Sequence, residues 1–362
     1  MKTRWMYMPD LRSDSMNSCP YRLTSCVWEI TLACCFSCKY CGSKAGKARR
    51  DELSTDECLD ICDQLNDLGC RRVNLIGGEV FMRRDWRTIV QRLSEYGIRV
   101  TIITNGFLFT EDIIRDLRDL DIESVAVSLD GVERVHDRYR QPGSYARAVK
   151  AIEALTGAGI VTTMITTLNA ENVLSLEELY AGIRRYPLAA WQLQACSPMG
   201  NAAATGVDVR FDPNAVIGFV VRHRGDAPFP IGIADNIGYF TADEGLIRGD
   251  PYGRRTFPGC GAGLSVIGID SVGNVRGCES MYDARFIEGN LRETPLRDIW
   301  ENPDGFAYNR RFTPDLLTGE CASCEYGAYC GGGCRSYNFF VHRKLYEYPN
   351  CARSLRDNGR NT

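Results

Sequence analysis

Seventeen cysteines in a chain of 362 residues constrain this sequence more than any other feature. Many of them lie in short C-x2-C and C-x3-C spacings, which suit thiolate ligands of one metal centre better than disulfide bridges. The chain is also long enough to bury a core, so it does not need the disulfide framework of a small secreted domain. The three histidines (His136, His223 and His342) are too dispersed for a histidine-based site. We therefore expect thiolate-bound iron–sulfur clusters in a reducing compartment.

The remaining composition is ordinary and narrows the class of protein further. Hydrophobic residues make up 44% and charged residues 25% of the chain, and the formal net charge is −3. Basic residues occur as short pairs among many acids, so no nucleic-acid partner is expected. No apolar run reaches the length of a membrane span, and the first residues are too polar for a secretory signal. These features predict a cytoplasmic protein that does not associate with a membrane.

Short β-rich runs alternate with amphipathic segments from residue 27 to about residue 196. The expected strands are Val27–Leu32, Arg72–Ile76, Arg99–Thr104, Ser124–Leu129, Ile160–Thr167 and Ala190–Ala195. Ser54 and Glu57 form a capping box at the start of a helix expected over Ser54–Leu68, and a further helix begins at Ser175. Six βα units in a row predict an α/β fold, a partial (β/α)6 TIM-like barrel with a parallel sheet.

The rest of the chain divides into a bridge and a cysteine-rich end. The expected parts are an N-terminal segment (1–24), the partial barrel (25–200), a bridging region (201–254), a small metal-stapled domain (255–355) and a tail (356–362). The bridging region holds one expected helix near Pro213–Arg222. The small domain contains an expected hairpin over Leu264–Cys278 that turns near Asp270–Asn274.

The first group of cysteines follows the first expected strand. Cys34, Cys38 and Cys41 lie in one loop, so three thiolates can hold three irons of a [4Fe–4S] cluster and leave the fourth iron open. A second register, Cys35-x2-Cys38-x2-Cys41, also exists, but a ferredoxin-type site needs a fourth cysteine soon afterwards. The next one, Cys58, falls on the apolar stripe of an expected helix. A structural zinc loop would likewise need four ligands.

The Cys34-x3-Cys38-x2-Cys41 spacing after the first strand of a βα barrel resembles the signature of the radical S-adenosylmethionine (SAM) superfamily. The resemblance implies that SAM binds the open iron through its amino and carboxylate groups. One-electron cleavage of SAM would then give a 5′-deoxyadenosyl radical, which abstracts a hydrogen atom from the substrate. In this register Cys35 is not a ligand.

Further residues that resemble the superfamily's SAM site follow the next strands, at the end where barrel enzymes place their chemistry. The resemblance implies that Gly77-Gly78-Glu79 receives the SAM amino group, with Val80 in place of the usual proline. The other implied SAM contacts are Thr104, Asn105, Ser128, Asp130, Arg140, which would pair with the SAM carboxylate, and Tyr40, which would pack against adenine. Taken singly, such residues are as often caps or surface ion pairs.

Seven cysteines of the last third occur in an order that resembles the SPASM domain, which holds two auxiliary [4Fe–4S] clusters. The resemblance assigns Cys260, Cys278 and Cys334 to auxiliary cluster I and Cys321, Cys324, Cys330 and Cys351 to auxiliary cluster II. No fourth cysteine follows Cys260 closely, so an open or non-cysteine ligand position is expected on cluster I, with Cys196 as one alternative. Two zinc ribbons are the alternative for the whole domain.

The resemblance also bears on Glu279, which directly follows Cys278. Sulfatase-maturing relatives have an aspartate general base at this place, so Glu279 would accept a proton as a substrate radical is oxidised. The alternative is an exposed acid beside a hairpin. Three of the remaining cysteines lie on or near the first helix and are expected to be core residues: Cys58, Cys62 and Cys70. The roles of Cys19 and Cys26 are left undecided.

Together the two resemblances cover residues 25 to 352 and imply a radical SAM maturase that acts on a ribosomally made peptide. The expected product is a thioether or carbon–carbon crosslink, with the auxiliary clusters accepting the second electron. The alternatives are peptide epimerisation, formylglycine formation, dehydrogenation or epimerisation of a small molecule, and a non-catalytic electron carrier. The implied partners are the precursor peptide and an electron donor of the flavodoxin or ferredoxin type. About 24 residues precede the first strand. This favours a separate leader-binding protein, or recognition through residues 197–255 and the barrel mouth.

Overall fold

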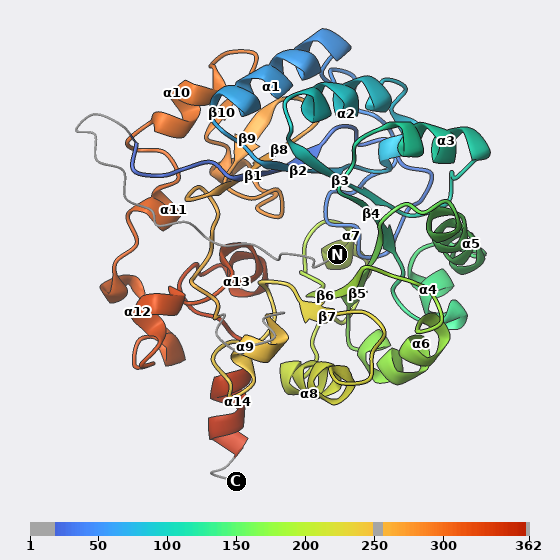
Figure 1. The fold of residues 1–362 in the computed structure, drawn as a ribbon. Coiled ribbons are helices and arrows are strands. Elements are labelled where there is room, and N and C mark those ends of the chain that lie inside the picture. Colours follow the sequence, from blue (N-terminus) through green and yellow to red (C-terminus); the bar gives the residue numbers. More distant parts are fainter. Residues whose placement is uncertain (1–18, 249–255, 360–362) are drawn as a thin grey trace.

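One sheet of ten strands, in the order β10-β9-β8-β1-β2-β3-β4-β5-β6-β7, runs through the protein. The structure, a computed structural model, describes residues 19–248 and 256–359. Figure 1 shows the sheet curving around a central space, with most of the long helices on its outer side. Most of the expected N-terminal segment, the end of the bridging region and the last residues of the tail lie outside the described residues.

Seven parallel strands form the curved part of the sheet. They are β1 (Ser25–Glu29), β2 (Arg72–Ile76), β3 (Arg99–Thr104), β4 (Ser124–Ser128), β5 (Thr162–Leu168), β6 (Ala190–Ala195) and β7 (Ile231–Ile233). The predictions for β2, β3 and β6 are confirmed residue for residue. The first strand ends earlier than predicted because the backbone N–H of Leu32 donates to the Glu52 carboxylate (2.6 Å) instead of to a neighbouring strand. The α/β partial barrel is therefore confirmed, and β7 extends it by one strand.

The helices that cover the outer face follow the strands in turn. They are α1 (Thr55–Asp67), α2 (Trp86–Glu95), α3 (Glu111–Asp119), α4 (Glu133–Tyr139), α5 (Ser144–Gly157), α6 (Leu176–Ile183) and α8 (Pro213–His223), with a short α7 (Asn201–Thr205) before α8. The capping box of α1 is confirmed, with Ser54 and Glu57 each accepting from the other's backbone N–H. At α6, Ser175 is the N-cap residue but makes no side-chain cap, since a 3-10 turn precedes it.

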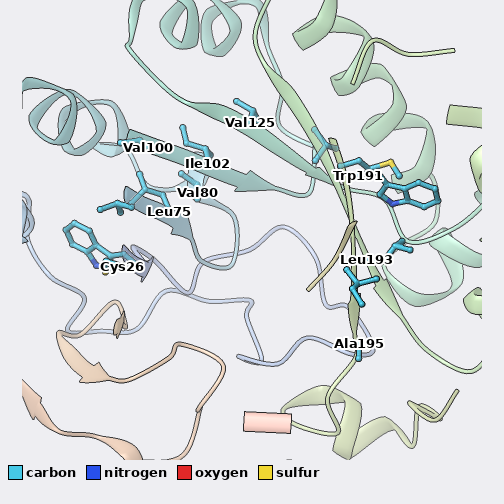
Figure 2. Close-up of a cluster of buried hydrophobic side chains, with 14 of the residues drawn as sticks. Cys26, Leu75, Val80, Val100, Ile102, Val125, Trp191, Leu193 and Ala195 are labelled. Atoms are coloured by element: carbon cyan, nitrogen blue, oxygen red, sulfur yellow. The ribbon is translucent and has the colours of Figure 1, made fainter. Parts of the chain in front are cut away.

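The core lies between the sheet and the outer helices, and part of it is seen in Figure 2. Leu75, Val100, Ile102 and Val125 lie on successive strands and are fully buried. Burial of each such side chain stabilises the fold by roughly 1.5–3 kcal/mol. The predicted core role is confirmed for the helix cysteines, and the undecided Cys26 joins the core. The exposed fractions are 0% for Cys26, Cys58 and Cys62 and 5% for Cys70.

The C-terminal region continues the same sheet beyond its first strand. The predicted hairpin is confirmed as β8 (Val266–Ile269) and β9 (Asn274–Arg276), and Asp270 accepts hydrogen bonds from the backbone of Val272 (3.1 Å) and Asn274 (3.0 Å) at the turn. Strand β8 pairs in parallel with β1, and β10 (Gly289–Asn290) follows β9. The remaining helices are short: α9 (Glu244–Ile247), α10 (Leu296–Glu301), α11 (Ala307–Arg310), α12 (Gly327–Cys330), α13 (Arg335–His342) and α14 (Ala352–Gly359).

Among the described residues, none of the helices has both the length and the apolar character needed to cross a lipid bilayer.

Candidate active site

The cysteine loop, residues 34–41, leaves the carboxyl end of β1 and is held by backbone hydrogen bonds from three other parts of the chain. The N–H of Cys34 donates to Gly46 (2.9 Å), and that of Lys39 donates to Tyr139 at the end of α4 (2.8 Å). On the other side, Asn201 at the start of α7 donates through its N–H to Cys41 (2.8 Å) and through its side chain to the carbonyl of Cys38 (2.9 Å). The loop conformation is therefore fixed by the protein itself.

The surroundings of the cysteine loop raise the pKa of two of its thiols. Burial raises the pKa of Cys38 to about 12, and a hydrogen bond with Cys35 together with burial raises that of Cys34. Thiols in such surroundings become thiolates when a bound cation compensates for the lost solvation. All 17 cysteines of the chain are free, so no disulfide competes for these sulfurs. The donor set fits an iron–sulfur cluster.

The Gly77-Gly78-Glu79 segment after β2 docks directly against the start of the cysteine loop. The N–H groups of Gly78 and Glu79 donate to the carbonyls of Thr31 (2.8 Å) and Ala33 (2.7 Å). A Cβ atom added to Gly77 would lie 2.4 Å from the Thr31 oxygen, and one added to Gly78 would lie 2.2 Å from the Ala33 oxygen. Only glycine fits at both positions, because any side chain would push the two loops apart.

Glu79 is fully enclosed and holds the loop after β3. Its carboxylate accepts hydrogen bonds from the Thr104 hydroxyl (2.8 Å) and the Asn105 N–H (2.8 Å). Burial outweighs these bonds and raises the pKa of Glu79 to about 7. The Asn105 amide in turn lies 3.5 Å from the sulfur of Cys35 and 3.8 Å from that of Cys34. A positive group beside Glu79 would hold it as a carboxylate.

Asp130, just beyond β4, is the centre of a buried ion pair. Its carboxylate accepts from the Tyr40 hydroxyl, from Arg140 Nε and from the Thr167 N–H (2.7 Å). Burial favours the neutral acid, but Arg140 and the hydrogen bonds hold the pKa of Asp130 below its usual value. The His136 ring accepts from the Asp130 N–H (3.0 Å), which fixes the turn.

Two polar groups around this pair have no partner among the described residues. Arg140 is only 10% exposed, and its Nη groups make no hydrogen bond there, because Asp130 takes Nε alone. The Ser128 hydroxyl at the end of β4 makes none either. These donors are free to receive an anionic or hydroxylated ligand beside Tyr40, whose ring centroid lies 5.7 Å from that of Tyr139. The groups present fit the carboxylate and ribose of SAM.

The thiols influence one another within each of the two expected sets of C-terminal cysteines, and the assignment of these sets to clusters stays a prediction. Burial and then Cys260 raise the pKa of both Cys278, to about 12, and Cys334. In the other set, burial and then Cys351 raise the pKa of Cys330 to about 12. An effect of one thiol on the pKa of another requires that the two sulfurs lie close together. In the part of the chain that the structure describes, no three His, Cys, Asp or Glu side chains converge as they would around a single metal ion.

Three consecutive glycines separate the two sets. Gly331, Gly332 and Gly333 all have positive φ (+66°, +79° and +81°), a run that only glycine adopts readily. Arg335 and Asn338 hold the carbonyls of this run, and the Asn338 amide donates to Gly332 at 2.6 Å. The chain therefore turns sharply between two neighbouring cysteines, Cys330 and Cys334, which are expected to belong to different sets.

Two predictions near these sets require comment. Cys196 packs with Tyr40 and Ala202 on the side of the cysteine loop, whereas Cys260 and Cys278 belong to a different packed group. The interpretation of Glu279 as an exposed acid is wrong, since it is 5% exposed. Within the described residues neither of its carboxylate oxygens makes a hydrogen bond, and Arg276 lies in ion-pair range at 3.8 Å. Burial and then Glu29 raise its pKa well above the usual range.

Asp235 and the loop after β7 were missed by the sequence predictions. The Asn236 side chain bonds both backbone groups of Ala195 (3.0 and 2.9 Å), and the carbonyl of Asn236 accepts from the Tyr348 hydroxyl. Asp235 contributes to the raised pKa of Cys334, after burial and the neighbouring thiols of Cys260 and Cys278. Strand β7 has only three residues, Ile-Gly-Ile, too few for a periodic signal.

Comparison with families and curated proteins gives the following matches. Residues 28–181 match the radical SAM superfamily, and residues 260–325 match the SPASM family, an iron–sulfur cluster-binding domain. Mycofactocin maturase MftC of Mycolicibacterium smegmatis is 32% identical over 322 residues, which span 87% of this chain and 78% of that protein. The AdoMet-dependent heme synthase of Methanosarcina barkeri is 28% identical over 337 residues, 90% of this chain and 95% of that protein.

Solved structures share the fold at lower identity. Streptococcus suis SuiB bound to S-adenosylmethionine matches with a TM-score of 0.73 and 17% identity, over 91% of this chain and 76% of that one. Native anSMEcpe with bound AdoMet and the Cp18Cys peptide matches with a TM-score of 0.70 and 15% identity, over 92% of this chain and 95% of that one.

Proposed function

Because the chain belongs to the radical SAM superfamily and carries a SPASM domain, we propose that it is a peptide maturase. In this proposal it takes a hydrogen atom from a ribosomally made precursor peptide and oxidatively installs a thioether or carbon–carbon crosslink. The observation that carries the proposal is the pairing of β1, which leads into the cysteine loop, with β8, which lies between Cys260 and Cys278 in the sequence, so that one sheet joins the two cysteine regions. A substrate between them can lose a hydrogen atom on one side and an electron on the other.

The residues around the cysteine loop would hold SAM, which, with its cluster, supplies the 5′-deoxyadenosyl radical. Cys34, Cys38 and Cys41 would bind the cluster. The buried carboxylate of Glu79 would receive the SAM ammonium, and the free Nη groups of Arg140 would receive its carboxylate. Asp130 orients Arg140 and Tyr40 together, so one carboxylate sets the position of both contacts. The two glycines before Glu79 let the backbone approach closely.

The auxiliary sets would carry electrons away from the substrate radical. Cys260, Cys278 and Cys334 would hold cluster I, and Cys321, Cys324, Cys330 and Cys351 would hold cluster II. Glu279 follows Cys278, and neither of its oxygens is engaged within the described residues. Its raised pKa makes the deprotonated carboxylate a strong base, which would accept the proton that the oxidised substrate releases.

We place the protein in the cytoplasm, because free thiols and iron–sulfur clusters need a reducing compartment. The proposed partners are the precursor peptide, a separate protein that binds its leader, and a one-electron donor of the flavodoxin or ferredoxin type. The relatives named as mycofactocin maturases support a peptide substrate.

The test is anaerobic reconstitution with SAM, a reductant and the precursor peptide encoded nearest the gene, followed by mass measurement of the peptide. The proposal predicts a loss of two hydrogens, located by fragmentation. An unchanged mass with continued formation of 5′-deoxyadenosine would contradict crosslinking. A gain of one mass unit in deuterated water would then identify epimerisation.

A second candidate function is oxidation of a tetrapyrrole side chain. It is supported by the similarity to the AdoMet-dependent heme synthase of Methanosarcina barkeri, because the matched region spans 95% of that protein. An iron porphyrin added to the purified enzyme would then show a shifted absorption band and be converted with SAM. The peptide proposal predicts no conversion of the porphyrin.

A further inference from the structure

A groove of about 540 Å3 lies on the outer face of the barrel between α3 and α5, and the proposed function does not use it. We call it the α3/α5 groove. Its charged lining consists of four cations and one acid: Arg115, Arg118, Arg147, Lys150 and Glu111. Its apolar lining includes Phe107, Phe109 and Ile114, all partly exposed. Aromatic residues and arginines are enriched in protein interfaces, and a polar rim usually surrounds their apolar centre.

The floor of this groove touches the cysteine loop. The Phe107 ring packs edge-to-face on Phe36, with centroids 5.2 Å apart, and Phe36 lies within the loop between Cys34 and Cys38. The Phe107 N–H also donates to the side chain of Asn105 (2.9 Å), whose amide lies 3.8 Å from the Cys34 sulfur. A molecule seated in the groove is thus separated from the loop cysteines by one layer of side chains.

Most of the positively charged side chains that line the α3/α5 groove have no acidic partner among the described residues. Arg118 and Lys150 are exposed and make no hydrogen bond or ion pair with any described residue. Arg147 lies over the Phe107 ring at 5.1 Å, and only Arg115 is neutralised, by Asp112 (2.6 Å). The whole chain carries a net charge of −3, so this excess of cations is local. It favours an acidic partner.

A second groove of similar size provides a contrast. It measures about 620 Å3, lies beside α1 and α10, and is lined by four acids and two arginines: Asp60, Asp67, Glu293, Asp298, Arg292 and Arg297. Figure 1 shows that α3 and α5 lie across the molecule from α12, which carries the auxiliary cysteine Cys330. The α3/α5 groove therefore faces away from the side where substrate would meet the auxiliary clusters.

We propose that the α3/α5 groove docks the acidic protein that supplies electrons to the cluster of the cysteine loop. The partner is a small redox protein of negative surface charge with a low-potential one-electron centre near its surface. It loses one electron and the cluster gains it, with no proton or group transferred. This deepens the proposed function, which already includes an electron donor, by assigning that donor a docking surface; it rests on the proposed radical SAM chemistry but not on the identity of the substrate.

The test uses the reconstituted holoenzyme and an acidic bacterial flavodoxin reduced to its hydroquinone, with dithionite as a small-molecule reductant for comparison. Rapid mixing at low ionic strength measures cluster reduction by visible absorbance, and 5′-deoxyadenosine formation measures turnover. The variant is Arg118→Glu with Lys150→Glu, and Arg118→Gln with Lys150→Gln gives the intermediate charge. The matched control is Arg71→Glu with Arg184→Glu, two exposed cations outside the groove.

The proposal predicts that charge reversal lowers the flavodoxin-driven rate by about tenfold or more, that added salt narrows the difference, and that the dithionite-driven rate is unchanged. The neutral variant should fall between, and the control should match the parent enzyme. An unchanged flavodoxin rate would overturn the proposal, and so would an equal loss with both reductants. Weakened binding of the precursor peptide with normal flavodoxin kinetics would also overturn it, assigning the groove to the peptide leader instead.

Discussion

The cysteine loop and the C-terminal cysteines present thiols by different physical means. The loop is fixed by hydrogen bonds from α4, α7 and residue 46, and it leaves a strand in the middle of a buried sheet. The C-terminal cysteines lie on short helices and turns, where a glycine run is held by the side chains of Arg335 and Asn338. From this difference we expect cluster binding to stabilise the C-terminal region more than the barrel, whose cysteine loop is already held by hydrogen bonds from the protein.

The largest expected effect is that cysteine substitutions in the two regions abolish different steps of the reaction. Cys38→Ala should reduce 5′-deoxyadenosine formation to the background of cluster-free protein, because two thiolates no longer hold the cluster. Cys330→Ala should preserve SAM cleavage but abolish peptide modification. Hydrogen exchange should also speed up across residues 314–355 in the second variant, with the barrel strands unaffected. Loss of SAM cleavage in both variants would mean that the two regions do not act separately.

The next effect concerns the buried ion pair of the barrel. Asp130→Asn leaves Arg140 buried without a counter-charge, which should cost about 3–5 kcal/mol of unfolding free energy and weaken SAM binding. Denaturant unfolding and equilibrium dialysis measure the two losses. Asp208→Asn is the matched control, since its partner Arg210 is 88% exposed and the pair should contribute nothing measurable. Equal losses in the two variants would refute the special role of Asp130.

A smaller effect should appear in the pH dependence of SAM binding. The pKa of Glu79 in the free protein is about 7, so its carboxyl group is increasingly protonated as the pH falls through 7. A protonated Glu79 cannot pair with the SAM ammonium, and the Kd should therefore rise about tenfold between pH 8 and pH 6. Glu79→Gln should bind weakly at both pH values. A parent enzyme with a constant Kd across this range would exclude Glu79 as the ammonium partner.

The smallest effect should come from a cysteine that is not a ligand. Cys62→Ala removes a fully buried sulfur from α1 and should lower the free energy of unfolding by about 1 kcal/mol, with the iron content unchanged. Thermal unfolding and iron analysis measure the two quantities. A loss of iron in this variant would contradict the division into core and ligand cysteines.

The sequence predicted well those features of the fold that depend on residues close together in the chain. Alternating apolar residues located β2, β3 and β6, and the cap at Ser54 located the start of α1. The resemblance to the SPASM domain implied the two C-terminal sets, and their assignment stays a prediction, because Cys260, Cys278 and Cys334 are far apart in the sequence. The strands and the cap depend on neighbours in sequence, and a single sequence reports them directly.

Long-range features of the site carried no such signal. The pairing of β1 with β8 joins residues more than 200 positions apart, and it has no periodicity of its own. Asn201 clamps the cysteine loop from a segment that the sequence placed in the bridging region, and Asp235 follows a strand too short to detect. The enclosure of Glu279 depends on how β8 packs on β1, so its burial could not be inferred from the residues around it.

The most direct test of the account follows the hydrogen atom. The precursor peptide is prepared with deuterium at carbon-bound positions, and the 5′-deoxyadenosine formed by the parent enzyme is analysed by mass spectrometry. The account predicts transfer of one deuterium from the peptide into 5′-deoxyadenosine, together with the modified peptide. Formation of unlabelled 5′-deoxyadenosine from the fully deuterated peptide would contradict the claim that the peptide is the substrate.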